Sequence, residues 1–268
     1  MKHKKNQEDS EDLSKKVFAL GPEYIAVERL GKGTYGTVYK AKIRGKDFYV
    51  AIKKIKNEMD DEGIPSTALR EIAILKKMKH PNVVNVQGIA FNNNNIELCL
   101  EYCRYDLKKL IDYKKNDSSF YNVAFVKNMM YQLLKGVEHL HSHKILHRDL
   151  KPQNILVNKN PFTIKLADFG NCRLFNKTNF STNIGTLGYA APELSIQKYD
   201  PTKCDLWSIG VIIYRLKFNE VPLTLYGGDI PGKFDNKHLD DLVRKLIVVD
   251  SNKRIDWDEY FNHPFFKN

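Results

Sequence analysis

The chain contains 268 residues, of which 42% are hydrophobic, so it can bury a substantial core as one two-lobed enzyme or as two small domains. Its 43 Lys and Arg residues against 32 Asp and Glu give a formal charge of +11. This excess suits anionic partners such as nucleotides or phosphorylated segments, although a solvated basic surface is the simpler interpretation. The sequence indicates neither a membrane span nor a basic helix interleaved with aromatics for direct nucleic-acid binding.

The N-terminal residues 1–18 are predicted to form a flexible tail. They are polar and lack the apolar core of a secretory signal. The cluster Lys2–Lys5 would favour nuclear import, but it is too short to establish it. The cysteines form no C-x-x-C pair, which is typical of reduced thiols in an intracellular protein: Cys99, Cys103, Cys172 and Cys204.

Strand-like runs follow this tail. Apolar residues that alternate or run together, with many β-branched and aromatic side chains, predict strands at residues 24–31, 37–43, 48–55, 83–90 and 96–101. One helix interrupts them. It would begin with Ser66 and Thr67 as N-cap residues, and Ala68, Ile72 and Leu75 then recur at helical spacing.

The rest of the chain is mainly helical. Helices are predicted at 106–113, 123–141, 203–216 and 239–248, with short strands at 155–157 and 164–166. The fold class is therefore α+β and bilobal. A small β-rich N-lobe with one key helix would span 19–102, a larger mainly helical C-lobe would span 103–268, and a hinge would lie near Glu101–Arg104.

The run from Gly31 to Val38 reads G-x-G-x-x-G-x-V between two predicted strands. Glycines allow a backbone to close over phosphate groups, because no Cβ stands in the way. A dinucleotide-binding fold would place this pattern between a strand and a helix, and here a further strand follows. The remaining alternative is a plain glycine-rich hairpin.

The run His147–Asn154 carries the chemistry. Asp149 can accept a proton from a substrate hydroxyl, Lys151 can neutralise charge on a transferred phosphoryl group, and Asn154 can bind a metal ion through its amide oxygen. Asp168, which begins an Asp-Phe-Gly run, can supply the main metal carboxylate. Upstream, Lys53 lies on a predicted strand, and Glu71 shares a helical face with Leu75 and would point inward.

A second cluster, His139, His141 and His143, has two interpretations. Zinc binding is one. The favoured alternative is a helix end at which the histidines cover the last carbonyl groups.

These motifs, of which Ala191-Pro192-Glu193 is the last, occur in the order typical of protein kinases. The chain resembles that family from Tyr24 to Phe266. The resemblance implies a protein-kinase-like fold, ATP and Mg²⁺ as cofactors, protein Ser or Thr as substrate, Lys53 paired with Glu71, and Glu193 paired with Arg254. It also implies a set of nucleotide-binding residues: Leu30, Gly31, Lys32, Gly33, Thr34, Tyr35, Gly36, Thr37, Val38, Ala51, Lys53, Glu101, Cys103 and Leu156.

The segment Pro65–Glu71 is similar to the signature helix of cyclin-dependent kinases, and so is Gln153 within the catalytic run. This narrower resemblance implies a cyclin-like subunit that pushes Glu71 toward Lys53, a role in cell-cycle or transcription control, and a location in the nucleus and cytoplasm. Thr34 and Tyr35 would be inhibitory phosphorylation sites, since phosphate there would repel the phosphates of ATP.

The same resemblance implies an activating phosphate in the segment before Thr186. Three arginines match the family's phosphate-binding cluster: Arg70, Arg148 and Arg173. Ser181 is the predicted phosphorylation site, and Thr182 is the competing candidate.

The second lobe departs from the narrower family. Gly185 and Ala190 stand where cyclin-dependent kinases carry other residues, and the arginine replaced by Ala190 helps to select proline after the target residue. Only 75 residues follow Glu193 (268 − 193), so the usual insert that docks a small accessory subunit is not expected. Two alternatives therefore remain beside a cyclin-dependent kinase: a cyclin-independent Ser/Thr kinase, and a pseudokinase scaffold.

Overall fold

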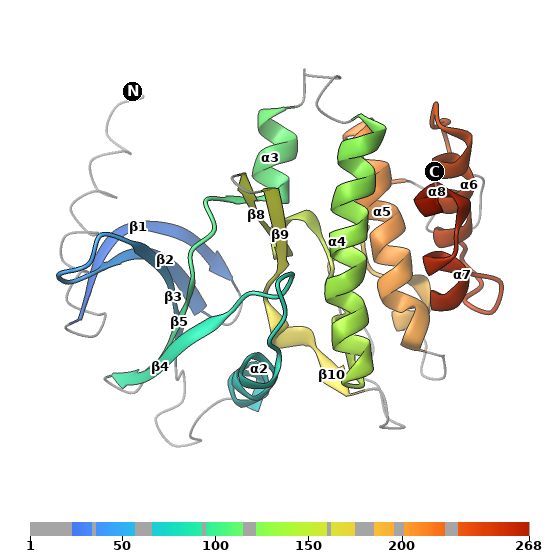
Figure 1. Cartoon of the computed structure of the whole chain (residues 1–268). Coiled ribbons are helices and arrows are strands. Elements are labelled where there is room, and N and C mark those ends of the chain that lie inside the picture. The colour runs from blue at the N-terminus through green and yellow to red at the C-terminus, as the bar shows by residue number, and fades with distance from the viewer. Residues whose placement is uncertain are drawn as a thin grey trace, which may run out of the picture. The chain divides into compact units, whose positions relative to one another are not determined.

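The computed structural model describes residues 23–33, 36–56, 66–92, 95–114, 122–159, 162–174, 185–195, 201–222 and 230–267 (Figure 1). The chain divides into two compact units. One contains residues up to Lys79 together with Val84–Cys103, and the other contains His80–Val83 together with the chain from Arg104 onward. The predicted tail, residues 1–18, lies outside the described residues.

The first unit is built on a five-stranded antiparallel sheet with the strand order β1-β2-β3-β5-β4, drawn in blue to teal in Figure 1. Its strands are β1 (Tyr24–Gly33), β2 (Gly36–Ile43), β3 (Tyr49–Lys56), β4 (Val86–Asn92) and β5 (Asn95–Glu101). One face buries a small apolar cluster of Ala41, Val50, Ile52 and Cys99. Alternation along the strands places these side chains on a common face, as the sequence pattern predicts.

One predicted strand boundary was wrong. The strand expected from residue 83 begins only at Val86, because Val83 forms an isolated parallel bridge with Leu166. The backbone of Asn82 accepts a hydrogen bond from the Leu166 N–H at 2.8 Å, and its side chain donates to the Ile164 carbonyl at 2.9 Å. These contacts attach the segment before β4 to the second unit, which a strand pattern alone does not reveal.

The helix that the structure describes in the first unit is α2 (Ser66–Lys77). Ala68, Glu71 and Leu75 are each 2% exposed, so the face predicted to point inward does so. Burial of this face stabilises the helix. The two lysines in its last turn add to this, because their positive charges interact favourably with the carbonyl groups at the C-terminal end. The N-cap side chains predicted at positions 66 and 67 lie outside the described side chains.

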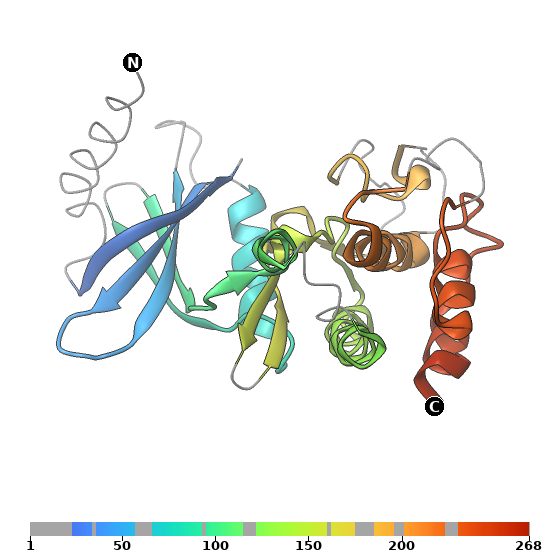
Figure 2. The same cartoon turned by 90° about the horizontal axis from the view of Figure 1, so that it is seen from above.

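The second unit consists mainly of helices. Figure 2 views α3, α4 and α5 nearly end-on, so the three axes run side by side. The helices are α3 (Leu107–Tyr113), α4 (Val123–Ser142), α5 (Cys204–Phe218), α6 (Lys237–Leu246), α7 (Trp257–Phe261) and α8 (Pro264–Lys267). Asp106 caps α3 and Asn122 caps α4, each accepting a backbone N–H bond. The four longer helices therefore agree with their predicted positions to within a few residues.

Helix α5 forms the centre of this unit. Its sequence is apolar on all sides, and from Cys204 to Tyr214 every residue is buried. Such a helix has no solvent face and must be surrounded by other elements. At its end, Asn219 adopts a left-handed conformation and its N–H bonds the Arg215 carbonyl. Two polar residues near its start, Asp205 and Ser208, are buried as well.

Short strands and turns complete the unit. The strands are β6 (Tyr105–Asp106), β7 (Ile145–Leu146), β8 (Ile155–Lys159), β9 (Phe162–Leu166) and β10 (Arg173–Leu174). They form a three-stranded sheet, β6-β8-β9, and a β7-β10 pair. Single 3₁₀ turns are η2 (Pro152–Asn154), η3 (Phe169–Asn171), η4 (Pro192–Ser195) and η5 (Pro201–Lys203). The segments between these small elements carry the predicted catalytic residues.

The three histidines near the end of α4 do not converge on one point. His139 stacks on His80, with ring centroids 4.9 Å apart, and makes a tilted contact with the ring of His143 at 4.6 Å. The His139 carbonyl accepts bonds from the Ser142 hydroxyl and from His143 Nδ1, as the helix-end interpretation requires. His141 instead bonds the Asp205 carboxylate at 2.9 Å. Within the described residues, no group of three His, Cys, Asp or Glu side chains is arranged to hold a metal ion.

The stacked histidines predict a loss of stability on the acid side of neutrality. Burial, and then the neighbouring ring of His139, lowers the pKa of His80 below its usual 6.5, and burial with His143 lowers the pKa of His139. Below pH 6.5 these two histidines therefore bind more protons in the unfolded chain than in the folded chain, so the free energy of unfolding falls as the pH falls. His139→Phe keeps a ring for stacking and should weaken this dependence.

Urea unfolding between pH 5 and 8 measures the effect. His238→Phe on α6, outside the stack, is the control and should retain the slope of the wild type. If His139→Phe showed the same slope as the wild type, titration of the stack would not be the cause.

Candidate active site

The catalytic run His147–Asn154 follows β7 and is anchored by α5. The Asp205 carboxylate accepts the backbone N–H groups of His147 at 3.0 Å and Arg148 at 2.9 Å, besides the bond from His141. Burial alone would raise the pKa of Asp205, but the His141 bond, nearby histidine charge and the Arg148 N–H hold that pKa below its usual value. The ionised carboxylate thus fixes the backbone at Arg148, which adopts a left-handed φ of 64°.

His147 connects this run to the Asp-Phe-Gly segment. Its Nε2 donates to the Ala167 carbonyl at 3.1 Å, and its ring packs against Phe169 with centroids 5.5 Å apart. Its Nδ1 accepts a hydrogen bond from the N–H of Asp149 at 3.4 Å. Both His147 and Phe169 are fully buried. Phe169 therefore belongs to the core, and Asp168 just before it is placed by that packing.

Asp149 lies at the centre of a polar network and is only 5% exposed. Lys151 Nζ donates to its Oδ2 at 2.9 Å and to the Thr186 hydroxyl at 2.7 Å. The Thr186 hydroxyl donates in turn to Asp149 Oδ1 at 2.7 Å. A carboxylate in such a cluster is oriented before any substrate arrives. The structure thus brings together the two residues that the sequence predicted as base and phosphoryl contact.

The two predicted metal ligands lie on either side of the β8–β9 hairpin. Asn154 uses its Nδ2 to bond the Asp149 backbone carbonyl at 2.8 Å and Asp149 Oδ2 at 3.2 Å. Its N–H also bonds the Lys151 carbonyl, and its own carbonyl accepts from Ala167 N, one residue before Asp168. Asp168 has a left-handed φ of 63°, which a non-glycine residue adopts only where the surroundings impose it.

In the first unit, Lys53 on β3 forms a buried ion pair with Glu71 on α2. The distances from Nζ to the two carboxylate oxygens are 2.7 and 2.8 Å, and the residues are 8% and 2% exposed. Lys53 is opposite Val38 on β2, which is opposite Gly31 on β1. The glycine-rich turn and the lysine therefore lie in one row across the sheet, as a phosphate-holding surface requires.

The glycine-rich turn itself is described only in part. Gly36 has no room for a side chain, because an added Cβ would overlap the backbone carbonyl oxygen of Lys54. Thr34 and Tyr35 lie outside the described residues. Among the other predicted nucleotide contacts of this unit, Ala51 and Cys103 are buried, and Glu101 accepts the Asn85 N–H. Leu156 is half-buried on β8 in the second unit.

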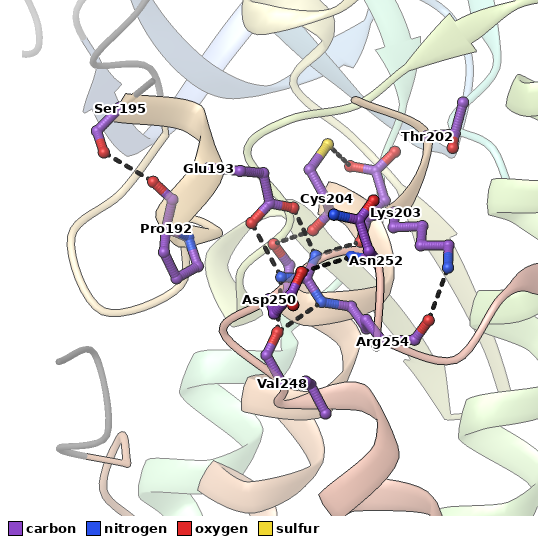
Figure 3. Close-up of polar contacts among 12 residues, drawn as sticks. Pro192, Glu193, Ser195, Thr202, Lys203, Cys204, Val248, Asp250, Asn252 and Arg254 are labelled. Atoms are coloured by element: carbon purple, nitrogen blue, oxygen red, sulfur yellow. Dashed lines mark hydrogen bonds and ion pairs between the residues drawn. The ribbon is translucent and has the colours of Figure 1, made fainter. Parts of the chain in front are cut away.

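Glu193 and Arg254 form the predicted buried ion pair, which Figure 3 shows with the guanidinium facing the carboxylate. The two N···O distances are 2.5 and 2.9 Å. Arg254 also donates to the carbonyls of Val248 and Lys203, and its guanidinium lies over the ring of Trp207 at 5.1 Å. This cluster attaches the segment after Thr186 to the start of α5.

Gly185 and Ala190, the two departures noted in the sequence, are packed against each other. Gly185 has a φ of 103°, and a Cβ there would lie 2.9 Å from the Ala190 Cβ and 3.0 Å from the Arg148 carbonyl oxygen. A side chain at position 185 would therefore displace this turn or the catalytic run, and the next residue, Thr186, contacts Asp149.

Two polar partners of Asp149 were missing from the predicted site. Thr186 was treated only as a landmark of the segment before Ala191, and Asn171 was not singled out. Both contact Asp149 across 37 and 22 residues of sequence. The position of a hydroxyl residue shortly before the Ala191-Pro192-Glu193 run could have suggested Thr186. No local signal indicates Asn171.

The predicted regulatory residues are only partly described. Ser181 and Thr182 lie outside the described residues. Arg148 donates through Nε and Nη2 to the Asn171 carbonyl at 2.9 and 2.6 Å. Arg173 is half-buried in the second unit, and Arg70 is half-buried on α2 in the first.

The family model for the protein kinase domain matches residues 24–266, which is nearly the whole chain. In the described part of the chain, no helix is long and apolar enough to cross a membrane. The five-stranded antiparallel sheet with its helix, the buried Lys53–Glu71 pair and the mainly helical second unit are the fold of that family. The chain is therefore a member of the protein kinase family.

Proposed function

We propose that this kinase transfers the γ-phosphoryl group of Mg·ATP to Ser and Thr hydroxyls of proteins. The observation that carries the proposal is the buried carboxylate of Asp149, oriented by Lys151, Asn154 and Thr186. A base within hydrogen-bond reach of a substrate hydroxyl can take its proton as the oxygen attacks phosphorus. The alternative of a pseudokinase scaffold is disfavoured because Lys53, Asp149 and Asp168 are all present.

The residues fit Mg²⁺ and ATP phosphates. The Asn154 amide bonds Asp149 through Nδ2, so its Oδ1 is the atom that can serve as a metal ligand together with the Asp168 carboxylate. Hard oxygen donors of this kind, few in number, suit Mg²⁺, which neutralises phosphate charge when bound. Lys53, held by Glu71, would bind the α- and β-phosphates. Lys151 would neutralise the phosphoryl group during transfer.

The position of Thr186 supports Ser and Thr over Tyr as acceptor. Its own short side chain reaches Asp149 Oδ1 at 2.7 Å from the segment that precedes Ala191. A peptide lying along that segment would need a similarly short side chain to place its hydroxyl at the same carboxylate. A tyrosine hydroxyl, carried beyond a ring, would extend past the base.

Transfer of ³²P from labelled ATP to matched Ser, Thr and Tyr peptides tests this proposal. We expect label on the Ser and Thr peptides and only background on the Tyr peptide. A peptide library with and without proline after the acceptor residue measures the preference for proline. We expect this preference to be weak, because Ala190 stands where cyclin-dependent kinases carry an arginine. Label on the Tyr peptide alone would contradict the assignment. So would the absence of label both on every peptide and on a general protein substrate such as myelin basic protein.

We further propose dependence on a cyclin-like subunit, with a role in cell-cycle or transcription control in the nucleus and cytoplasm. The support is the Pro65–Glu71 pattern and the apolar side chain of Leu69, which is 50% exposed on α2. One observation favours the cyclin-independent alternative. The Lys53–Glu71 pair, which a cyclin would be needed to form, is already present in the isolated chain.

Activity of the isolated chain distinguishes these alternatives. A cyclin-dependent kinase should gain about 5- to 150-fold in activity when it is purified with a helical cyclin-like partner from its native cell. Equal activity with and without any copurified protein would support the cyclin-independent alternative. Phosphorylation at Thr34, Tyr35 and Ser181 remains a prediction, which phosphopeptide mapping of the same preparation tests.

A further inference from the structure

The carboxylate of Asp149 is bonded asymmetrically. Its Oδ2 faces three donors, namely Lys151 Nζ at 2.9 Å, Asn154 Nδ2 at 3.2 Å and Asn171 Nδ2 at 3.3 Å. Its Oδ1 faces the Thr186 hydroxyl at 2.7 Å. An ionised carboxylate offers about two lone-pair directions on each oxygen. The acceptor capacity of Oδ2 is therefore filled, and Oδ1 is the oxygen that can still accept a proton from a substrate hydroxyl.

Two of the three donors to Oδ2 have other roles in the proposed reaction. Lys151 shares its ammonium group between Asp149 and Thr186, and in the proposed reaction it follows the phosphoryl group. Asn154 must keep its amide turned so that Oδ1 can bind the metal ion. Asn171 has neither task. It is the donor to Oδ2 that can stay in place while charge moves during transfer.

Asn171 is itself held by the residue next to the base. Its backbone carbonyl accepts two bonds from the Arg148 guanidinium, at 2.9 and 2.6 Å. Its position at the end of η3 is set by the buried residues Phe169 and Cys172, whose backbones are joined by a hydrogen bond. The two segments are thus connected twice, once from Arg148 to Asn171 and once from Asn171 to Asp149.

We propose that Asn171 is a positioning residue for phosphotransfer: its amide holds Asp149 Oδ2, so that Oδ1 is presented to the acceptor hydroxyl. This inference rests on the proposed function. It assigns to the residue after the Asp-Phe-Gly run a direct part in orienting the base. The donated bond has to survive each turnover, so only a side chain with an N–H or O–H in the same place can replace it.

Steady-state kinetics of three variants test the proposal. Asn171→Leu removes the donor at similar volume, and we expect kcat to fall about 10-fold while KM for ATP and peptide changes less than about twofold. Asn171→Asp keeps the shape but places a carboxylate beside Asp149, so a larger loss of about 100-fold is expected. Asn171→Ser retains a shorter donor and should fall between the wild type and Asn171→Leu. Asn262→Leu, at an exposed position after α7, is the matched control and should keep wild-type kinetics.

A double-mutant cycle separates positioning from a general structural role. If Asn171 acts through Asp149, then Asn171→Leu should cause no further loss in the residual single-turnover rate of Asp149→Asn. The same fold-loss in both backgrounds would overturn the proposal, and so would an unchanged kcat for both Asn171→Leu and Asn171→Asp in folded protein. An inactive wild type would overturn the proposed function as well, whereas an active wild type with indifferent Asn171 variants would overturn this inference alone.

Discussion

Replacing Asp149 by asparagine is expected to lower kcat for phosphotransfer by about 10²- to 10⁴-fold. Asparagine has the shape of aspartate but cannot take the substrate proton. Its amide would also place an N–H group against donors that now face a carboxylate, since Lys151 and Asn154 both donate to Oδ2. Chemistry should therefore suffer while nucleotide binding is largely retained, because Lys53 and Glu71 are untouched.

Two measurements check this expectation. Radiometric assays give kcat, and displacement of a fluorescent nucleotide gives the affinity for ATP. Asp235→Asn is the matched control, because that carboxylate is also bonded to a lysine, at 2.6 Å, but lies on the surface. It should leave kcat within about twofold of the wild type. Turnover by Asp149→Asn within about tenfold of the wild type would show that another group serves as the base.

The elements that the sequence predicts well are those with a strong local pattern. Helix α5 is apolar on all sides, β2 alternates apolar and polar residues, and β3 begins with an apolar run. Each pattern is sufficient to specify a helix or a strand. Val83 shows where this fails. Its apolar neighbours favour a strand, but its bridge to Leu166 is made with a segment far along the chain, and no local pattern encodes that partner.

The active site divides in the same way. Asp149, Lys151 and Asn154 are recognisable because they occur in one short run with a fixed spacing. Thr186 and Asn171 reach the same carboxylate from other segments, so their roles depend on packing of Gly185 against Ala190 and of Phe169 in the core. The histidine run illustrates the opposite risk. Close spacing alone would allow a common ligand, but the helix directs His141 to Asp205 and His139 to His80, which agrees with the favoured helix-end interpretation.

Glu193→Ala is expected to lower the free energy of unfolding by about 3–5 kcal/mol. Glu193 and Arg254 are 4% and 1% exposed, so removal of the carboxylate leaves a buried guanidinium without its counter-charge. The bonds from Arg254 to the Val248 and Lys203 carbonyls, which Figure 3 shows, should remain in the variant, but neutral carbonyls do not replace an anion. Urea unfolding measures the loss.

A surface pair and a double variant make this prediction specific. Asp235→Ala removes the exposed partner of Lys217 and should cost only about 0–1 kcal/mol, because water screens that pair. Combining Glu193→Leu with Arg254→Met should recover much of the loss, since neither charge then remains buried. If Glu193→Ala cost no more than Asp235→Ala, water or another anion would have to compensate Arg254. If the double variant were as unstable as the single one, the shape of the cluster, rather than its charge, would be what holds the segment after Thr186 to α5.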